Sequence, residues 1–371
     1  MVEQSLAERS SGTATAARRE RARARLASSG ADALLVTALP NIRYLTGFSG
    51  SSGALLLGAA GPDELLTDFR YALQVETEVD PAVEVCIRPD PLLVVARDRL
   101  TLRGAGRVAF ERAHLTVAAW EEWRSAEGPT LVGVEGWIEA LRAVKGPDEL
   151  AALRRAAAIA DKAFEEILGH VRVGISEREL AGQLALSLAA QGAERNAFEP
   201  VVAFGANSAL PHARPGARAL ARGDTILLDF GAVIEGYCSD LSRTVAFGEP
   251  VASVREAYGL VLAAQRAALG GLRAGLTGRA ADALARDVIE AAGQGDGFGH
   301  SLGHGIGLEV HEAPRLSRLS EDTLLSNMVV TVEPGVYIET IGGVRIEDDV
   351  VVGPDGVEVL TRARKDDMLI L

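Results

Sequence analysis

The chain has 371 residues, of which 48% are hydrophobic and 24% are charged, an ordinary composition for a folded protein. Its 38 basic and 51 acidic residues give a net charge of −13, which argues against a surface that binds nucleic-acid phosphates or anionic membranes. Two cysteines cannot build a disulfide framework, and no apolar run approaches the roughly 18 residues of a membrane span. The first residues are polar and Arg-rich without an apolar signal core, so we expect a soluble, cytoplasmic protein.

The N-terminal third of the chain alternates strand-like and helical patterns. Short apolar runs predict strands at 33–36, 54–57, 64–67 and 83–87. Helices are predicted at 14–30, 91–100 and 117–125. The run of small residues at 47–53 predicts a loop. This alternation favours a compact α/β domain over residues 1–136, followed by a second domain over 137–371.

The second predicted domain repeats an order of helices followed by strands. Helices are predicted at 138–144, 147–170, 176–191, 254–269 and 279–292. Ser176 and Glu179 have the spacing of a capping box, which marks the start of one of them. Strand patterns dominate 196–245 and then 303–371. The order predicts two halves, each of helices then strands, related as an internal pseudo-repeat.

Both strand-rich stretches carry acids within apolar strands, where a charge is costly to bury. A hairpin centred between positions 234 and 235 would put Asp229 directly opposite Asp240, and a turn near Thr340 would put Glu333 opposite Glu347. Facing carboxylates repel each other unless a proton or a cation lies between them, and four in one core would need about two divalent cations. The alternative, surface acids on edge strands, explains one such residue better than it explains two facing pairs.

Three of the six histidines, His300, His304 and His311, lie close together among glycines, which allow tight turns and close approach to a ligand. Carboxylates combined with imidazole are ligands for Mn, Zn, Co or Fe, whereas an all-oxygen set would favour Mg or Ca. The set contains no cysteine, which argues against a structural zinc site. His114 and His170 are interpreted as ordinary core or surface residues.

Other catalytic motifs match only in part. The GHSLG string at 299–303 has the spacing of a serine-hydrolase elbow, but no strand-like run precedes it, and the acid and histidine do not follow in the required order. The His-Glu pair at 311–312 begins like a zincin helix, but the second histidine is missing and Pro314 would break the helix. The glycine-rich run at 47–53 lacks the strand–GxGxxG–helix context of a nucleotide site.

Taken together, the motifs resemble the pita-bread metallopeptidases, and within them the Xaa-Pro branch of aminopeptidase P and prolidase. The matching strings follow the family's order, at 207–212, 223–231, 237–244, 300–314, 333–337 and 343–348. Strings at 40–51 and 67–71 resemble the accessory domain of the same branch, which methionine aminopeptidases generally lack. The resemblance implies an α+β protein: a pita-bread (creatinase/aminopeptidase) catalytic domain at 137–371, preceded by a smaller α/β, creatinase-like accessory domain at 1–136.

The resemblance also implies roles for individual residues. The ligands of a dinuclear site would be Asp229, Asp240, His304, Glu333 and Glu347. Asp240 and Glu347 would bridge two divalent ions, with Mn preferred and Zn or Co as alternatives. The residues that contact the substrate would be His212, His300 and His311. Arg345 would orient the substrate or support a ligand, and Tyr337 is a weaker candidate for the same role. Creatinase-like relatives lack these ligands, whereas this sequence has all five.

The implied reaction is hydrolysis of the bond between an N-terminal residue and a following proline by a hydroxide that bridges the two metals. Glu333 would pass a proton to the departing nitrogen, and His311 would donate to the developing oxyanion. The expected partners are a proline-containing peptide and a second copy of the chain in a homodimer, with no nucleic acid and no membrane. We predict an Xaa-Pro aminopeptidase. An Xaa-Pro dipeptidase is the alternative, because arginines that could bind a free proline carboxylate are abundant. Further alternatives are a non-catalytic binding protein and a metal-dependent lyase or amidinohydrolase on the same fold.

Overall fold

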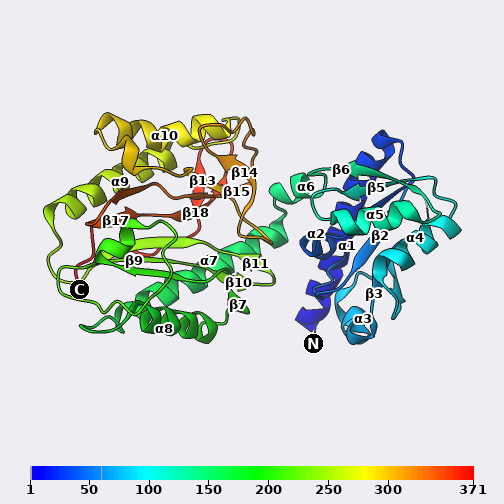
Figure 1. Ribbon diagram of the computed structural model, residues 1–371, viewed down its shortest axis with the longest axis horizontal. Helices are drawn as coiled ribbons and strands as arrows, with labels where there is room; N and C mark the ends of the chain where they lie inside the picture. The colour runs from blue at the N-terminus through cyan, green and yellow to red at the C-terminus, as the bar shows by residue number, and fades with distance from the viewer. Residues whose placement is uncertain (1, 60) are drawn as a thin grey trace. The chain divides into compact units, whose positions relative to one another are not determined.

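The computed structural model describes residues 2–59 and 61–371, so the predicted domain 1–136 includes two residues, 1 and 60, that lie outside the description (Figure 1). The chain divides into two compact units, Met1–Arg142 and Ala143–Leu371. A domain boundary after residue 136 stays a prediction. None of the described helices has both the length and the apolarity that crossing a membrane requires.

Within the described residues, the first unit is built on a six-stranded mixed sheet in the order β4-β3-β2-β1-β5-β6. Its strands are β1 (Ala33–Val36), β2 (Ala54–Gly58), β3 (Asp63–Thr67), β4 (Val83–Ile87), β5 (Arg107–Glu111) and β6 (Thr130–Val134). Its helices are α1 (Val2–Ser29), α2 (Leu39–Thr46), α3 (Gln74–Glu78), α4 (Leu92–Leu102), α5 (Val117–Ser125) and α6 (Glu139–Ala143), with a 3-10 turn η1 (Phe69–Tyr71). The sequence predicted β1 to β4 but missed β5 and β6. The edge strand β6 is only partly buried, so its apolar pattern is weak.

The second unit contains two halves of helices followed by strands, as predicted. The first half comprises α7 (Pro147–Leu168), α8 (Glu177–Ala190), β7 (Arg195–Asn196), β8 (Val201–Phe204), η2 (Gly205–Ala209), β9 (Thr225–Phe230), β10 (Ala232–Ile234), β11 (Tyr237–Cys238) and β12 (Leu241–Ala246). The second comprises α9 (Ala252–Gly271), α10 (Gly278–Ala291), η3 (Gly295–Gly297), β13 (Gly303–Gly305), β14 (Glu312–Leu316), β15 (Val329–Val332), β16 (Gly335–Ile338), β17 (Gly342–Arg345), β18 (Asp348–Val352) and β19 (Val357–Val359). The α+β class is confirmed.

The register of the first hairpin differs from the prediction. Asp229 on β9 pairs with Ser242 on β12, so the prediction that it lies directly opposite Asp240 is wrong. The chain reverses one position later than assumed, at Glu235 and Gly236, which have φ angles of 49° and 79°. Moving the turn by one position shifts every pair by two residues. Because side chains alternate with a period of two, Asp240 stays on the same side of the hairpin as Asp229, offset along the strand.

The second hairpin has the predicted register. β15 pairs with β18 and β16 pairs with β17 in one continuous antiparallel register, which reverses at Thr340 (φ 65°). This register places Glu333 opposite Glu347, at the break between the two paired segments.

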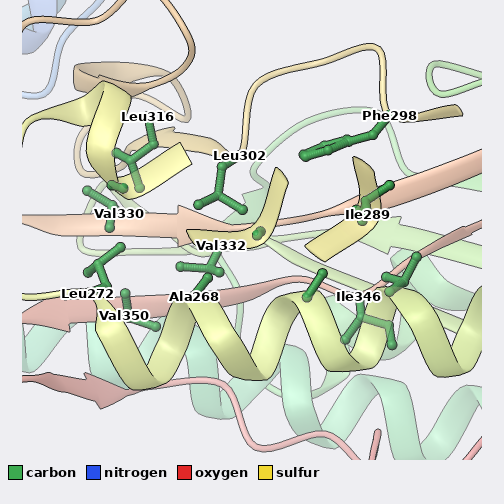
Figure 2. Packing of buried hydrophobic residues seen from close by; sticks show 14 of the residues in the cluster. Ala268, Leu272, Ile289, Phe298, Leu302, Leu316, Val330, Val332, Ile346 and Val350 are labelled. Carbon is green, nitrogen blue, oxygen red and sulfur yellow. The ribbon is translucent and has the colours of Figure 1, made fainter. Parts of the chain in front are cut away.

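In each half the helices cover one face of the sheet and the acids lie on the other. The residues of β9 that pack against α7 and α8 are Ile226, Leu228 and Phe230. Those of β15 that pack against α9 and α10 are Val330 and Val332 (Figure 2). Strand alternation therefore directs Asp229 and Glu333 away from the helices. The two inner faces meet, since Ser242 Oγ of the first half donates to Glu347 of the second at 2.6 Å.

Candidate metal centre

Four of the five predicted ligands come together where the inner faces of the two halves meet. His304 Nε2 lies 3.5 Å from Glu333 Oε1 and 3.9 Å from Asp240 Oδ2. Asp240, His304 and Glu347 offer ligand atoms that all lie within 4.8 Å of one another, a spacing that suits side chains around one ion. The fifth, Asp229, joins the group through Arg345, which donates to its Oδ2 from Nη2 at 2.5 Å.

In the described part of the chain, two acids of this group each have a buried carboxylate oxygen without a hydrogen-bond partner, which a cation could bind. Oδ1 of Asp229 and Oδ1 of Asp240 are buried and have no hydrogen-bond partner among the described residues. Burial, followed by the charge of Glu347, raises the pKa values of Asp240 and Glu333 well above their usual range. Burial, followed by the charge of Asp229, raises the pKa of Glu347 to about 8. Burying several negatively charged carboxylates side by side costs free energy unless positive charge lies among them. The set of ligand atoms therefore fits divalent cations.

The short strand β13 carries His304, whose Nε2 atom is available to bind a metal. His304 Nδ1 lies 3.0 Å from the carbonyl oxygen of Gly305, which can only accept, so Nδ1 carries the proton and Nε2 is left to bind a metal. Burial lowers the pKa of His304 to about 4, which keeps the ring neutral. Both neighbours must be glycine. A Cβ atom would lie 2.0 Å from Thr331 O at Gly303 and 2.1 Å from Ala313 O at Gly305.

Arg345 links the acids of the two halves. Beside its bond to Asp229, its Nε donates to Ser242 Oγ at 2.8 Å, and Ser242 in turn donates to Glu347. Its Nη1 donates to the hydroxyl of Tyr337 at 2.6 Å. The guanidinium is buried, with 3% of the residue exposed, so its donors have fixed directions. Arg345 therefore holds two of the predicted ligands, one directly and one through a serine.

Two of the three histidines predicted to contact the substrate, His300 and His311, lie beside this group. The hydroxyl of Tyr337 lies 3.0 Å from His300 Nε2, and the ring of His311 lies 4.3 Å from that of His304 between centroids. Burial, and more weakly Arg345 and His212, lowers the pKa of His300 to about 4. His311 is more exposed, and partial desolvation followed by the charge of Arg315 lowers its pKa. His212 is exposed at the surface beyond η2.

Sequence reasoning missed three polar residues that support the acids. Ser242 binds both Glu347 and Arg345. Thr331 donates to Glu333 at 3.2 Å, and Asp349 accepts the backbone N–H of Asp240 at 2.9 Å. Each lies two positions from a predicted ligand, on the same face of its strand. Strand alternation was the signal that could have found them.

Comparison with known proteins agrees with this geometry. Residues 151–354 match metallopeptidase family M24, and residues 18–144 match the creatinase/prolidase N-terminal domain. The chain belongs to metallopeptidase family M24. The family resemblance inferred from the motifs is thereby confirmed, together with the pita-bread domain and the N-terminal domain that precedes it. M24 is a family of dinuclear metal enzymes.

Relatives of this M24 peptidase match along most of their length. It is 41% identical to the uncharacterized peptidase YqhT of Bacillus subtilis over 338 residues. The aligned region covers 91% of this chain and 95% of YqhT. A solved Xaa-Pro dipeptidase from Bacillus anthracis has 41% identity and a TM-score of 0.93, covering 96% of this chain and 100% of that one. An X-Pro aminopeptidase from Thermotoga maritima has 36% identity and a TM-score of 0.87, with coverages of 94% and 99%.

Proposed function

We propose that this M24 peptidase hydrolyses the bond between an N-terminal residue and a following proline. The proposed holders of its two divalent ions are Asp229, Asp240, His304, Glu333 and Glu347. The observation that carries the proposal is the cluster of Asp240, His304 and Glu347, whose ligand atoms lie within 4.8 Å of one another. The names of the solved relatives, one an Xaa-Pro dipeptidase and one an X-Pro aminopeptidase, support the choice of substrate.

Different side chains of the site have different roles in the proposed reaction. When bound, the two ions supply Lewis-acid activation of water and of the substrate carbonyl. Glu333, which accepts from Thr331, is the group that carries a proton to the departing nitrogen. His311 donates to the oxygen on which negative charge develops, and its lowered pKa makes the neutral ring the donor. Arg345 keeps Asp229 in place throughout.

The substrate side of the site must recognise proline by its ring. The nitrogen of an Xaa-Pro bond carries no hydrogen, so a protease that grips the scissile N–H gains nothing here. We propose that His212 and His300 line the ring pocket. His300 suits this role because Tyr337 and the carbonyl of Ser301 fix both of its ring nitrogens, at 3.0 and 2.8 Å.

Substrate length separates two forms of the proposal. We propose an Xaa-Pro aminopeptidase, which acts on peptides that continue beyond proline. The dipeptidase alternative is supported by the name of the Bacillus anthracis relative. Turnover of Xaa-Pro and Xaa-Pro-Yaa should be compared directly, and a strong preference for the dipeptide would replace the first form with the second.

The experiment that tests the function is release of the first residue from Xaa-Pro peptides with added Mn²⁺, the proposed native metal, and with Co²⁺ or Zn²⁺. Glu333→Gln should abolish turnover. Glu339→Gln provides the matched control, because Glu339 is exposed near the turn of the same hairpin and should leave turnover unchanged. Absence of turnover with all three metals would overturn the proposal. Light scattering tests the further proposal of a homodimer, and cell fractionation tests a cytoplasmic location.

A further inference from the structure

A buried ion pair on α10, which the catalytic proposal does not use, binds the backbone of a neighbouring segment. Asp282 and Arg286 lie one helical turn apart and are 1% and 6% exposed. Arg286 Nε donates to Asp282 Oδ2 at 2.5 Å, and its Nη2 donates to Oδ1 at 2.9 Å. In sequence such a pair resembles an ordinary surface contact between i and i+4 residues. Here both charges are buried beside the core that α9 and α10 share with the sheet.

The pair binds the backbone of residues 298–302, which lie between η3 and β13. Arg286 Nη1 donates to the carbonyl oxygen of Phe298 at 2.9 Å, and Nη2 donates to that of His300 at 2.7 Å. The N–H of Leu302 donates to Asp282 Oδ1 at 3.0 Å. The guanidinium also lies 4.0 Å from the ring centroid of Phe298. Three backbone groups at alternate positions are thus held by one ion pair.

Core packing anchors the two ends of this segment, and the ion pair fixes its middle. Phe298 and Leu302 are buried members of the apolar cluster that Figure 2 shows. The residue between them, His300, is partly buried, and its ring lies beside Tyr337. The ring of His300 is held by Tyr337 and by the carbonyl oxygen of Ser301. Arg286 holds the carbonyl oxygen of His300 itself, so the backbone that carries the ring is fixed as well.

Stability alone does not account for an ion pair at this place. Replacing a buried pair by apolar side chains of similar volume is often neutral or stabilising, because desolvation offsets the attraction. The pair instead fixes the direction of the hydrogen bonds to the backbone, because a guanidinium holds its donors in a rigid, planar arrangement. We propose that Arg286, oriented by Asp282, is a positioning residue that fixes the imidazole of His300 for contact with substrate. This inference rests on the proposed function, in which His300 lines the proline pocket.

A double-mutant cycle in the metal-loaded, full-length protein tests the proposal. Arg286→Met should raise KM for an Xaa-Pro peptide by about tenfold or more with kcat less affected, because small misplacements of a contacting group are costly. Added to His300→Ala, the same change should have little further effect on KM, since its target is gone. Arg279→Met is the matched control, because Arg279 lies on the same helix in an exposed ion pair. Effects that multiply in the double variant would overturn the proposal.

Two further variants keep the test decisive if Arg286→Met does not fold. Arg286→Lys retains the charge but cannot donate to both carbonyls in the same geometry, so KM should lie between those of the wild type and Arg286→Met. Asp282→Asn should raise KM in the same direction. Wild-type KM values in both variants would contradict the proposal, as would a loss of bound metal that fully accounts for the change.

Amide hydrogen exchange separates failure of this proposal from failure of the proposed function. Absence of Xaa-Pro turnover by the wild type would overturn the function. In that case the N–H of Leu302 still reports on the ion pair, because it is bound to Asp282. Its exchange should be faster in Arg286→Lys than in the wild type or in the Arg279→Met control. Unchanged exchange would show that Arg286 does not fix this segment.

Discussion

Arg345 donates a hydrogen bond from Nη2 to Oδ2 of Asp229, across the junction of the two halves of the catalytic unit. The remaining carboxylate oxygen of Asp229 has no partner among the described residues. One oxygen is thus fixed by a buried guanidinium while the other stays available, an arrangement that suits a metal ligand.

Replacing Arg345 should therefore weaken metal binding. In Arg345→Met, Mn²⁺ affinity and kcat/KM should each fall by roughly 10- to 100-fold, the usual effect of removing the partner of a ligand. Calorimetric titration and steady-state kinetics measure the two effects. Arg364→Met is the control, because Arg364 forms an exposed ion pair with Glu165 and should change neither quantity. Wild-type affinity in Arg345→Met would contradict the role.

His304 is the single imidazole among the proposed ligands, so its loss should be severe. His304→Ala should reduce kcat/KM by roughly a thousandfold or more, about 4 kcal/mol of transition-state stabilisation, because metal activation is lost. Metal content per chain, measured by mass spectrometry, should fall in parallel. The exposed His170 provides the comparison, and His170→Ala should retain both metal and activity.

The glycine before His304 should not tolerate a side chain. In Gly303→Ala the new Cβ would lie 2.0 Å from Thr331 O, so β13 must shift away from β15. We expect a loss of about 1–3 kcal/mol in the free energy of unfolding, together with weaker metal binding. At Gly299 an added Cβ meets nothing within 4 Å, so the free energy of unfolding of Gly299→Ala should be close to that of the wild type. Urea unfolding of the two variants checks this, and equal stabilities would show that β13 can adjust.

Removal of metal should make stability depend on pH with a defined sign. In the metal-free protein the pKa of Glu347 is raised from 4.5 to about 8 by burial and then by Asp229, and those of Asp240 and Glu333 are also raised. The folded state then holds protons that the unfolded state releases. The free energy of unfolding should fall as pH rises from about 4.5 to about 8, the range set by Glu347.

Urea unfolding at several pH values, with EDTA or with excess Mn²⁺, measures this difference. With Mn²⁺ the fall should be absent, because ionised ligands bind the metal more tightly as pH rises. The metal-free Glu347→Gln variant should show a smaller pH dependence than the metal-free wild type. The same fall in the presence and absence of metal would contradict the proposed ligand set.

Local patterns in the sequence determined much of the second unit. The capping box of Ser176 and Glu179 forms as predicted at the start of α8, because its atoms lie within one turn of chain. The second hairpin also reverses at Thr340 as predicted, which was enough to set Glu333 opposite Glu347. Clustered glycines and histidines identified the segment around His304 before any contact was known.

The register of the first hairpin was not predictable from local patterns. Its turn uses a positive φ at Glu235, a residue type that gives no signal for that conformation, so the register was assigned two residues out. The ion pair of Asp282 and Arg286 gave no distinctive signal either, since only packing against the segment at 298–302 distinguishes it from a surface pair.

The sequence by itself indicated the candidate ligands and the strands that bear them, because strand periodicity and turns act over a few residues. Only the tertiary structure decided which of those groups touch. Ser242 and Glu347 are 105 positions apart and share a hydrogen bond. That contact exists because the helices cover the outer faces of both halves and leave the inner faces to pack against each other, an outcome set by burial of the whole unit rather than by any local pattern.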